Sequence, residues 1–234
     1  MDTAKPLHDI VVVFDLDDTL YAEADYVLSG KKSVAKFVDQ LFGEDLTSDI
    51  IACEDDFLEL ICDRLKLASA TKTSLLWHYR LHRPEISLRS DVAEVLHLLR
   101  EKGLPICVIT DGRSVTQRLK IAALGLRLDA TYISEDIGAE KPDMRAFAAV
   151  EADWPAARYV YIGDNIKKDF IAPNARDWIT CGLRPDSRHI HKYNIGIGDE
   201  QTVHGGHLPK YWANDFTEIE TLLVELCANS KQIC

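Results

Sequence analysis

The sequence predicts an α/β protein with a doubly wound, mostly parallel sheet and a small all-helical second domain. Short β-branched runs alternate with helical patterns along most of the chain, which is typical of a parallel sheet covered on both faces. One stretch, residues 21–86, shows helical periodicity throughout and no strand pattern. Short strands joined by crossover connections that are long enough to hold a helix favour a doubly wound sheet.

Five segments have the apolar, β-branched character of buried strands. Helices are expected between several of them, one from Ser90 as its N-cap to Gly103, and one from Ser114 to Gly125 with Gln117 completing a capping box. Residues 184–210 have no periodicity and are expected to form a loop before a closing helix. The five predicted strands are residues 10–14, 105–110, 130–134, 159–163 and 179–183.

The helical stretch is too long for an ordinary connection between two elements of one sheet. We therefore expect two domains: a sheet domain formed by residues 1–20 and 87–234, and a helical domain formed by residues 21–86.

The net charge of −11 argues against nucleic acid and anionic membranes as partners, because both attract basic surfaces. No apolar run approaches the roughly 20 residues of a spanning helix, and the opening stretch MDTAKPLHDI lacks the pattern of a signal peptide. The six cysteines form no C-x-x-C pair. We expect them to be reduced and the protein to be cytoplasmic.

Polar residues gather where the predicted strands end. The segment FDLDDTL places Asp15 and Asp17 directly after the first apolar run. In open α/β sheets ligands bind at the carboxyl ends of the strands, so residues at these ends are expected to lie together. The other residues at strand ends are Thr110, Asp111 and Gly112 in PICVITDG, Lys141 in EKPD, and Asp164, Asn165 and Asp169 in YVYIGDNIKKD.

Carboxylates this close repel one another unless a cation or proton lies among them. A phosphoryl group is also an anion, and two unit charges at about 4 Å interact by roughly 4 kcal/mol at an effective dielectric constant of 20. Mg²⁺ binds one or two carboxylates together with waters and substrate oxygens. Asp15, Asp164 and the backbone carbonyl of Asp17 are the expected ligands, and Asp169 is a further candidate for the metal site.

These four segments resemble the four motifs of the haloacid dehalogenase superfamily, in the order that the family has them. The motifs are D-x-D-x-T, a strand ending in Thr or Ser, a Lys before Pro, and G-D-x-x-x-x-D. The resemblance spans the chain, and the helical insert is similar to the cap that many members place after the first motif. It implies that residues 21–86 form a cap domain over the catalytic core.

The resemblance also implies roles for the site residues. Asp15 attacks phosphorus and forms an aspartyl-phosphate, while Asp17 protonates the leaving oxygen and then activates water. Lys141 steadies the nucleophile and the phosphoryl oxygens. Thr110 binds the transferring group together with the N–H groups of Asp111 and Gly112, and Arg113 and Asn165 are further candidates for contact with the substrate.

The predicted function is therefore that of a Mg²⁺-dependent phosphatase acting on a small phosphomonoester, with a sugar phosphate as first candidate and a nucleoside monophosphate as second. A phosphomutase or phosphotransferase has the same first step. A non-catalytic binding domain of the same fold does not need Asp17. Dehalogenases of the superfamily lack this second Asp, because halide needs no proton, so Asp17 favours phosphate chemistry.

Some residues allow two interpretations. His78 and His82, four apart in WHYRLHR, either bind a second anionic group or belong to an ordinary helix face. Tyr21, where the chain enters the helical stretch, is a candidate for lining the entrance to the site, and Asp18 is expected to be solvated or capping. Four histidines of the late loop have spacings like those of a zinc site, but no cysteine is interleaved and we expect none; they are His189, His191, His204 and His207.

Overall fold

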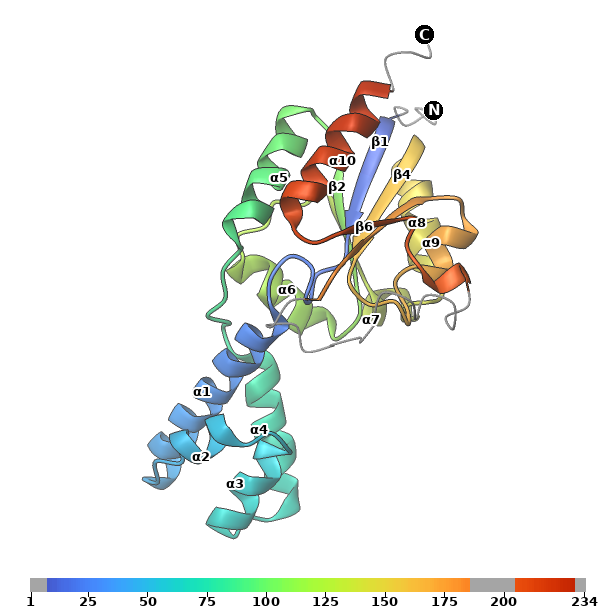
Figure 1. The fold of residues 1–234 in the computed structure, drawn as a ribbon. Helices are drawn as coiled ribbons and strands as arrows, with labels where there is room; N and C mark the ends of the chain where they lie inside the picture. The colour runs from blue at the N-terminus through green and yellow to red at the C-terminus, as the bar shows by residue number, and fades with distance from the viewer. Residues whose placement is uncertain (1–7, 186–204, 230–234) are drawn as a thin grey trace, which may run out of the picture. The chain divides into compact units, whose positions relative to one another are not determined.

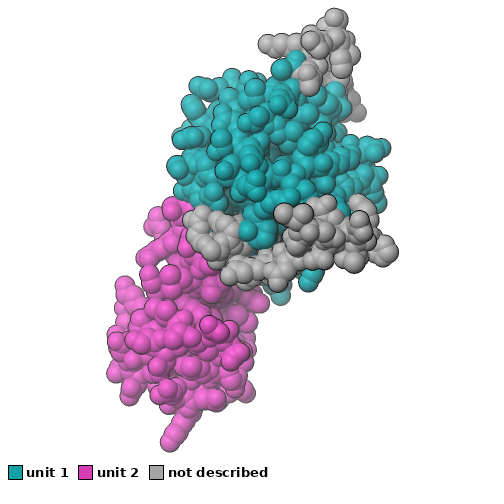
Figure 2. Space-filling model, viewed as in Figure 1, with its two compact units in different colours: residues 1–22, 88–114, 127–234 teal, residues 23–87, 115–126 magenta. Residues whose placement is uncertain are grey.

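A computed structural model describes residues 8–185 and 205–229 of the chain. The chain divides into two compact units (Figure 2). The first, here called the core unit, comprises residues 1–22, 88–114 and 127–234; the second, the helical unit, comprises residues 23–87 and 115–126. The helical unit thus takes in a second segment, 115–126, which the predicted range of 21–86 does not include.

The core unit is built on one six-stranded sheet in which every pair of neighbouring strands is parallel, so the predicted α/β class is confirmed. The strand order is β3-β2-β1-β4-β5-β6, which is a doubly wound arrangement starting from the centre. The strands are β1 (His8–Phe14), β2 (Ile106–Thr110), β3 (Ala130–Ile133), β4 (Ala156–Gly163), β5 (Ile179–Leu183) and β6 (Tyr211–Ala213).

The central strands are apolar because both of their faces are covered. Residues 10–14 of β1 and all five residues of β2 are buried, and β1 pairs with β2 on one side and β4 on the other. β6 was not predicted. It has only three residues, too few to show a period, and its place in the sheet depends on pairing with β5 at the edge.

Helices cover both faces of this sheet (Figure 1). α5 and α10 contact each other on one face, where Phe216 stacks on Phe14 of β1. α8 and α9 pack on the other face around a core that includes Phe147, Phe170 and Trp178. The helices of the core unit are α5 (Ser90–Glu101), α7 (Ser134–Ile137), α8 (Arg145–Asp153), α9 (Ile171–Ala175) and α10 (Phe216–Asn229), with the 3₁₀ helix η2 at Gly205–His207.

The start of α5 and the loop 184–210 differ from the prediction or lie beyond its test. Ser90 is the first residue of α5 rather than its N-cap; Arg89 is the N-cap and its side chain makes no capping hydrogen bond. Most of the predicted loop 184–210, including His189, His191 and His204, lies outside the described residues. The proposed alternative of a zinc site there therefore stays untested.

The helical unit has its own hydrophobic core. Val34 and Val38 of α1 pack with Ile50 of α2, Ile61 of α3 and Leu75 of α4. The described residues of this unit form no strand. Its helices are α1 (Glu23–Phe42), α2 (Thr47–Ala52), α3 (Phe57–Leu65), α4 (Ser69–Leu81) and α6 (Ser114–Ala123), the last from its second residue onward.

The segment 115–126 is tied to the rest of the helical unit by two contacts. The hydroxyl of Thr116 donates to the carbonyl of Arg80 at the end of α4, at 3.2 Å. The ammonium of Lys120 lies 4.2 Å from the centre of the Tyr26 ring on α1. These contacts explain why α6 groups with helices that precede it by many residues. Among the described residues, no helix combines the length and the apolar character needed to cross a bilayer.

The close approach of α1 and α4 requires a glycine at position 30. A Cβ added to Gly30 would overlap the ring of Tyr79 and lie 3.2 Å from His82 Cε1. Alanine is favoured over glycine in a helix by about 1 kcal/mol. Here we expect Gly30→Ala to lower the free energy of unfolding by about 1–3 kcal/mol instead, because of the overlap.

Urea unfolding followed by circular dichroism measures this change. In a Tyr79→Ala background the ring is gone, so the same Gly30→Ala substitution should become neutral or stabilising. Equal destabilisation in both backgrounds would contradict the packing explanation.

Candidate active site

The site forms where the direction of winding reverses. The chain begins at β1, adds β2 and β3 on one side, and then returns to add β4 on the other side. Asp15 directly follows β1 and Asp164 directly follows β4, so neighbouring strands deliver both carboxylates to one edge. This is the place where ligands bind in open α/β sheets.

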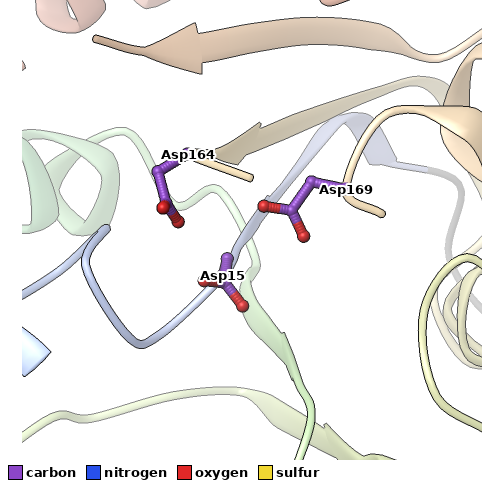
Figure 3. A group of neighbouring side chains, drawn as sticks. All are labelled: Asp15, Asp164 and Asp169. Atoms are coloured by element: carbon purple, nitrogen blue, oxygen red, sulfur yellow. The ribbon is translucent and has the colours of Figure 1, made fainter. Parts of the chain in front are cut away.

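Three carboxylates converge there: those of Asp15, Asp164 and Asp169 (Figure 3). One oxygen of each lies within 4.8 Å of the others, and all three residues are buried. The structure thus brings together the three side chains predicted for the metal site; Asp17, the fourth residue, is predicted to bind through its backbone carbonyl. Burying three carboxylates together is unfavourable unless positive charge compensates them.

Lys141 provides one such charge. Its Nζ lies 2.5 Å from Asp15 Oδ1 and 2.7 Å from Asp169 Oδ1. Burial alone lowers the pKa of a lysine, but the two carboxylates outweigh burial and hold the pKa of Lys141 well above its usual value. The lysine is therefore a fixed cation beside the predicted nucleophile.

Asp169 is held on both of its oxygens. Oδ1 accepts from the hydroxyl of Tyr161 at 3.2 Å, in addition to Lys141, and Oδ2 accepts from the N–H of Asn165 at 2.8 Å. A Cβ on Gly163 would lie 2.7 Å from Asp169 Oδ2, so the last residue of β4 must be glycine for this carboxylate to fit. These contacts fix Asp169 against Lys141.

Burial raises the pKa of the other two carboxylates, Asp15 and Asp164. Desolvation raises the pKa of Asp15 to about 7, although the charge of Lys141 opposes the shift. Desolvation, followed by repulsion from Asp169 and Asp15, raises the pKa of Asp164 well above its usual value. The hydroxyl of Thr19 donates to Asp164 at 3.2 Å. The site needs more positive charge than Lys141 provides.

Asp17 is held by Tyr21, and no sequence motif predicts this contact. The hydroxyl of Tyr21 donates to Asp17 Oδ1, and residues 17 and 21 form an isolated β-bridge. Tyr21 is buried in the core unit and orients Asp17, rather than lining an entrance. Asp18, expected to be solvated or capping, is buried, with a left-handed φ of 56°.

Asp111 connects three loops of the site. Its Oδ1 accepts from the backbone N–H of Lys141 at 3.0 Å, and its Oδ2 lies 2.9 Å from Lys168 Nζ. The neighbouring Gly112 N–H donates to Ser134 Oγ at 2.9 Å. The loop after β2 is thereby fixed to the loops after β3 and β4, with Thr110 buried at its start.

Two predicted substrate contacts have partners within the protein. Arg113 forms an exposed ion pair with Glu135, with Nη1 2.6 Å from Oε1. The side-chain carbonyl of Asn165 accepts from the N–H of Lys167 at 3.0 Å and closes a turn. Contact of either residue with a substrate stays a prediction.

The histidines of WHYRLHR have structural partners inside the helical unit. His82 is buried; its Nδ1 lies 2.5 Å from the carbonyl of Tyr79 and its Nε2 3.1 Å from Ser29 Oγ. His78 stacks on Phe37 and lies 3.1 Å from Ser33 Oγ. These contacts support the interpretation as an ordinary helix face.

The donor set fits a hard divalent cation. The candidate side-chain ligands are carboxylate oxygens, which Mg²⁺ prefers, and one oxygen of each lies within 4.8 Å of the others. Burial raises the pKa of Asp15 and Asp164, and a bound cation would oppose this shift and hold both groups ionised.

Residues 11–175 match the family of haloacid dehalogenase-like hydrolases, and this stretch contains every residue of the site described above. The chain belongs to this family. A glyceraldehyde 3-phosphate phosphatase of Methanopyrus kandleri is 25% identical to the hydrolase over 193 residues, which cover 74% of this chain and 83% of the relative.

Two further similarities are informative. A ribulose-1,5-bisphosphate 5-phosphatase of Halopiger xanaduensis is 32% identical over 102 residues, 42% of the hydrolase and 43% of that protein. A magnesium-bound structure of a HAD-hydrolase of Bacillus subtilis aligns with a TM-score of 0.59 at 18% identity, covering 93% of this chain and 99% of the other. The likeness to the Bacillus subtilis structure shows a common fold.

The raised pKa of Asp15 makes the stability of the metal-free hydrolase depend on pH. The carboxyl titrates at about 7 when folded and returns to 3.8 when unfolded. Between these values the folded state holds a proton that the unfolded state has lost, so stability falls as the pH rises through this window. We expect Asp15→Asn to make this fall shallower, because asparagine does not titrate and only Asp164, whose pKa is also raised, then contributes to it.

Urea unfolding at a series of pH values in EDTA measures the difference. Asp39→Asn, which changes an exposed carboxylate of α1, is the matched control and should follow the wild type. A pH profile of Asp15→Asn parallel to that of the wild type would contradict the expectation.

Proposed function

We propose that this hydrolase is a Mg²⁺-dependent phosphatase that hydrolyses a small sugar phosphate through an aspartyl-phosphate on Asp15. The observation that carries the proposal is the buried contact of 2.5 Å between Asp15 and Lys141, beside Asp164 and Asp169. A carboxylate fixed next to an ammonium at the edge of a sheet is poised to attack an anionic group whose charge the ammonium also stabilises.

Asp15 and Asp164, with the backbone carbonyl of Asp17, are the proposed metal ligands. A bound Mg²⁺ supplies the positive charge that offsets repulsion between the nucleophile and the phosphoryl group. The contacts of Asp169 with Lys141, Tyr161 and Asn165 occupy both of its oxygens. We therefore assign Asp169 to holding Lys141 rather than to direct ligation of the metal.

The chain's own residues then carry out two displacements. An oxygen of Asp15 bonds to phosphorus as the bond from phosphorus to the sugar oxygen breaks, and Asp17 gives its proton to that oxygen. Water next attacks phosphorus, Asp17 takes a proton from it, and the bond to Asp15 breaks to release phosphate. Tyr21 orients Asp17 for both transfers.

The remaining residues bind and orient the phosphoryl group. Lys141 and Thr110 donate hydrogen bonds to its oxygens, as does the N–H of Asp111, while the carboxylate of Asp111 keeps their loops together. Because the Gly112 N–H already donates to Ser134, we give Gly112 a smaller part in binding.

The helical unit is the proposed cap that selects the substrate. Both of its segments leave the core unit directly after a loop of the site: residues 23–87 follow the loop of Asp15 and Asp17, and residues 115–126 follow the loop of Thr110. A small helical cap suits a small substrate, since closure must exclude water around it.

The names of the relatives favour a phosphorylated sugar as substrate over a nucleoside monophosphate, which is our second candidate. We place the activity in the cytoplasm. The five described cysteines are all free thiols, which suits a reducing compartment.

Phosphate release tests the chemistry. A panel of sugar phosphates, nucleotides and small phosphoacids is assayed with Mg²⁺ or with EDTA. We expect turnover that requires the metal and falls by at least about 10⁴-fold in Asp15→Asn, because no other group forms the covalent bond. Asp39→Asn, which changes an exposed carboxylate of the helical unit, should keep the wild-type rate.

Other outcomes have distinct meanings. Exchange of phosphate between positions of a sugar without net release would indicate a phosphomutase. Absence of turnover across the panel, with a folded protein and Mg²⁺, would contradict the phosphatase assignment and favour a binding domain.

The two roles of Asp17 can be separated with p-nitrophenyl phosphate, whose leaving group needs no proton. For Asp17→Asn we expect a burst of nitrophenol and then turnover about 10²–10⁴-fold slower than in the wild type, because water still lacks its base. Tyr21→Phe keeps the carboxylate and should cost only about tenfold. Wild-type turnover of a sugar phosphate by Asp17→Asn would rule out the assignment.

A further inference from the structure

The ammonium of Lys141 has three N–H donors and three acceptors around it. They are Asp15 Oδ1 at 2.5 Å, Asp169 Oδ1 at 2.7 Å and the hydroxyl oxygen of Tyr161 at 3.1 Å. Lysine can donate no more than three hydrogen bonds. In this buried position the third donor would otherwise be left without a partner, which is unfavourable.

Tyr161 reaches this position from the interior of β4. Its ring is fully buried and makes edge contacts with Phe147, at 5.2 Å between centroids, and with Phe170, at 6.4 Å. A phenylalanine would make the same ring contacts and would still lie near the ammonium, which is 5.8 Å from the ring centroid. The hydroxyl is therefore the part of Tyr161 that packing does not explain.

That hydroxyl connects two charged groups. It accepts from Lys141 and donates to Asp169 Oδ1 at 3.2 Å, so both of its hydrogen-bonding functions are used. The carboxylate of Asp169 in turn accepts from Lys141 directly. Lys141, Tyr161 and Asp169 thus form a closed triangle of hydrogen bonds.

We propose that Tyr161 is a positioning residue of the reaction, whose hydroxyl holds the Lys141 ammonium against Asp15. The proposal rests on the phosphatase function proposed above and adds a residue to its site. Tyr161 lies two residues before the motif G-D-x-x-x-x-D, which begins at Gly163, and is not part of it.

A hydroxyl suits this place because it is neutral. Three carboxylates already lie near Lys141, and a fourth as third acceptor would add repulsion toward an incoming phosphoryl anion. The phenol satisfies the last N–H of the lysine without adding negative charge. With only two acceptors, one N–H of the ammonium would have no partner, and rotation about the Cδ–Cε bond would let the nitrogen leave the position that Asp15 requires.

Kinetics of Tyr161→Phe provide the first test, with the wild-type substrate and Mg²⁺. We expect kcat to fall by about tenfold or more, as for loss of one hydrogen bond to a charged group, with KM changed less than about twofold. The matched control is Tyr159→Phe, two residues earlier on β4. Its hydroxyl bonds to Ala156 and Trp154, away from Lys141, so its kcat should stay at the wild-type level.

A second readout does not depend on activity. The Lys141 ammonium should give a slowly exchanging ¹⁵N resonance in NMR spectra of the resting protein, because all of its N–H groups are bonded and buried. In Tyr161→Phe we expect hydrogen exchange at this group to be at least about tenfold faster, and in Tyr159→Phe to be unchanged. Thermal unfolding of both variants verifies that they are folded.

The two readouts separate the possible failures. Unchanged kcat and unchanged exchange in Tyr161→Phe would overturn the proposal. So would a lower melting temperature with unchanged exchange, since that marks a purely structural hydroxyl. If wild-type protein hydrolyses no phosphate but exchange still accelerates in Tyr161→Phe, the hold on Lys141 stands and the phosphatase function fails.

Discussion

An ammonium group and a carboxylate are taken out of water together at the centre of the sheet, where Lys141 meets Asp15. Such a pair is stable only if each charge keeps further partners, because desolvation costs about as much as the attraction returns. Asp169 and Tyr161 are those partners for the lysine. The arrangement of the site follows from satisfying this one buried cation.

The parallel sheet makes that arrangement possible. Asp15 and Lys141 are 126 residues apart in sequence, and parallel strands of one sheet, β1 and β3 on either side of β2, bring their loops to one edge. The carboxylate of Asp111 then joins the loop after β2 to those of Lys141 and Lys168. Distant loops are thus held by a rigid scaffold, which keeps reacting groups in place.

The sequence predicted the site where chemistry follows an apolar run, as with Asp15 after β1 and Asp164 after β4, because a strand end has a fixed place in a parallel sheet. It could not predict the contact of Tyr161 with Lys141, since a tyrosine within an apolar strand is usually part of the hydrophobic core. Strand β6 is too short for a period. An amphipathic pattern also does not show which unit a helix packs in. For this reason the prediction placed residues 115–126 in the sheet domain, whereas they belong to the helical unit.

The two-segment construction of the helical unit has a consequence for exchanging it between proteins. A graft of residues 23–87 alone would arrive without α6 and its contacts, the hydrogen bond of Thr116 to Arg80 and the cation over Tyr26. Transplanting this unit, in the laboratory or by recombination, therefore requires two simultaneous crossovers. Single substitutions within the unit carry no such requirement.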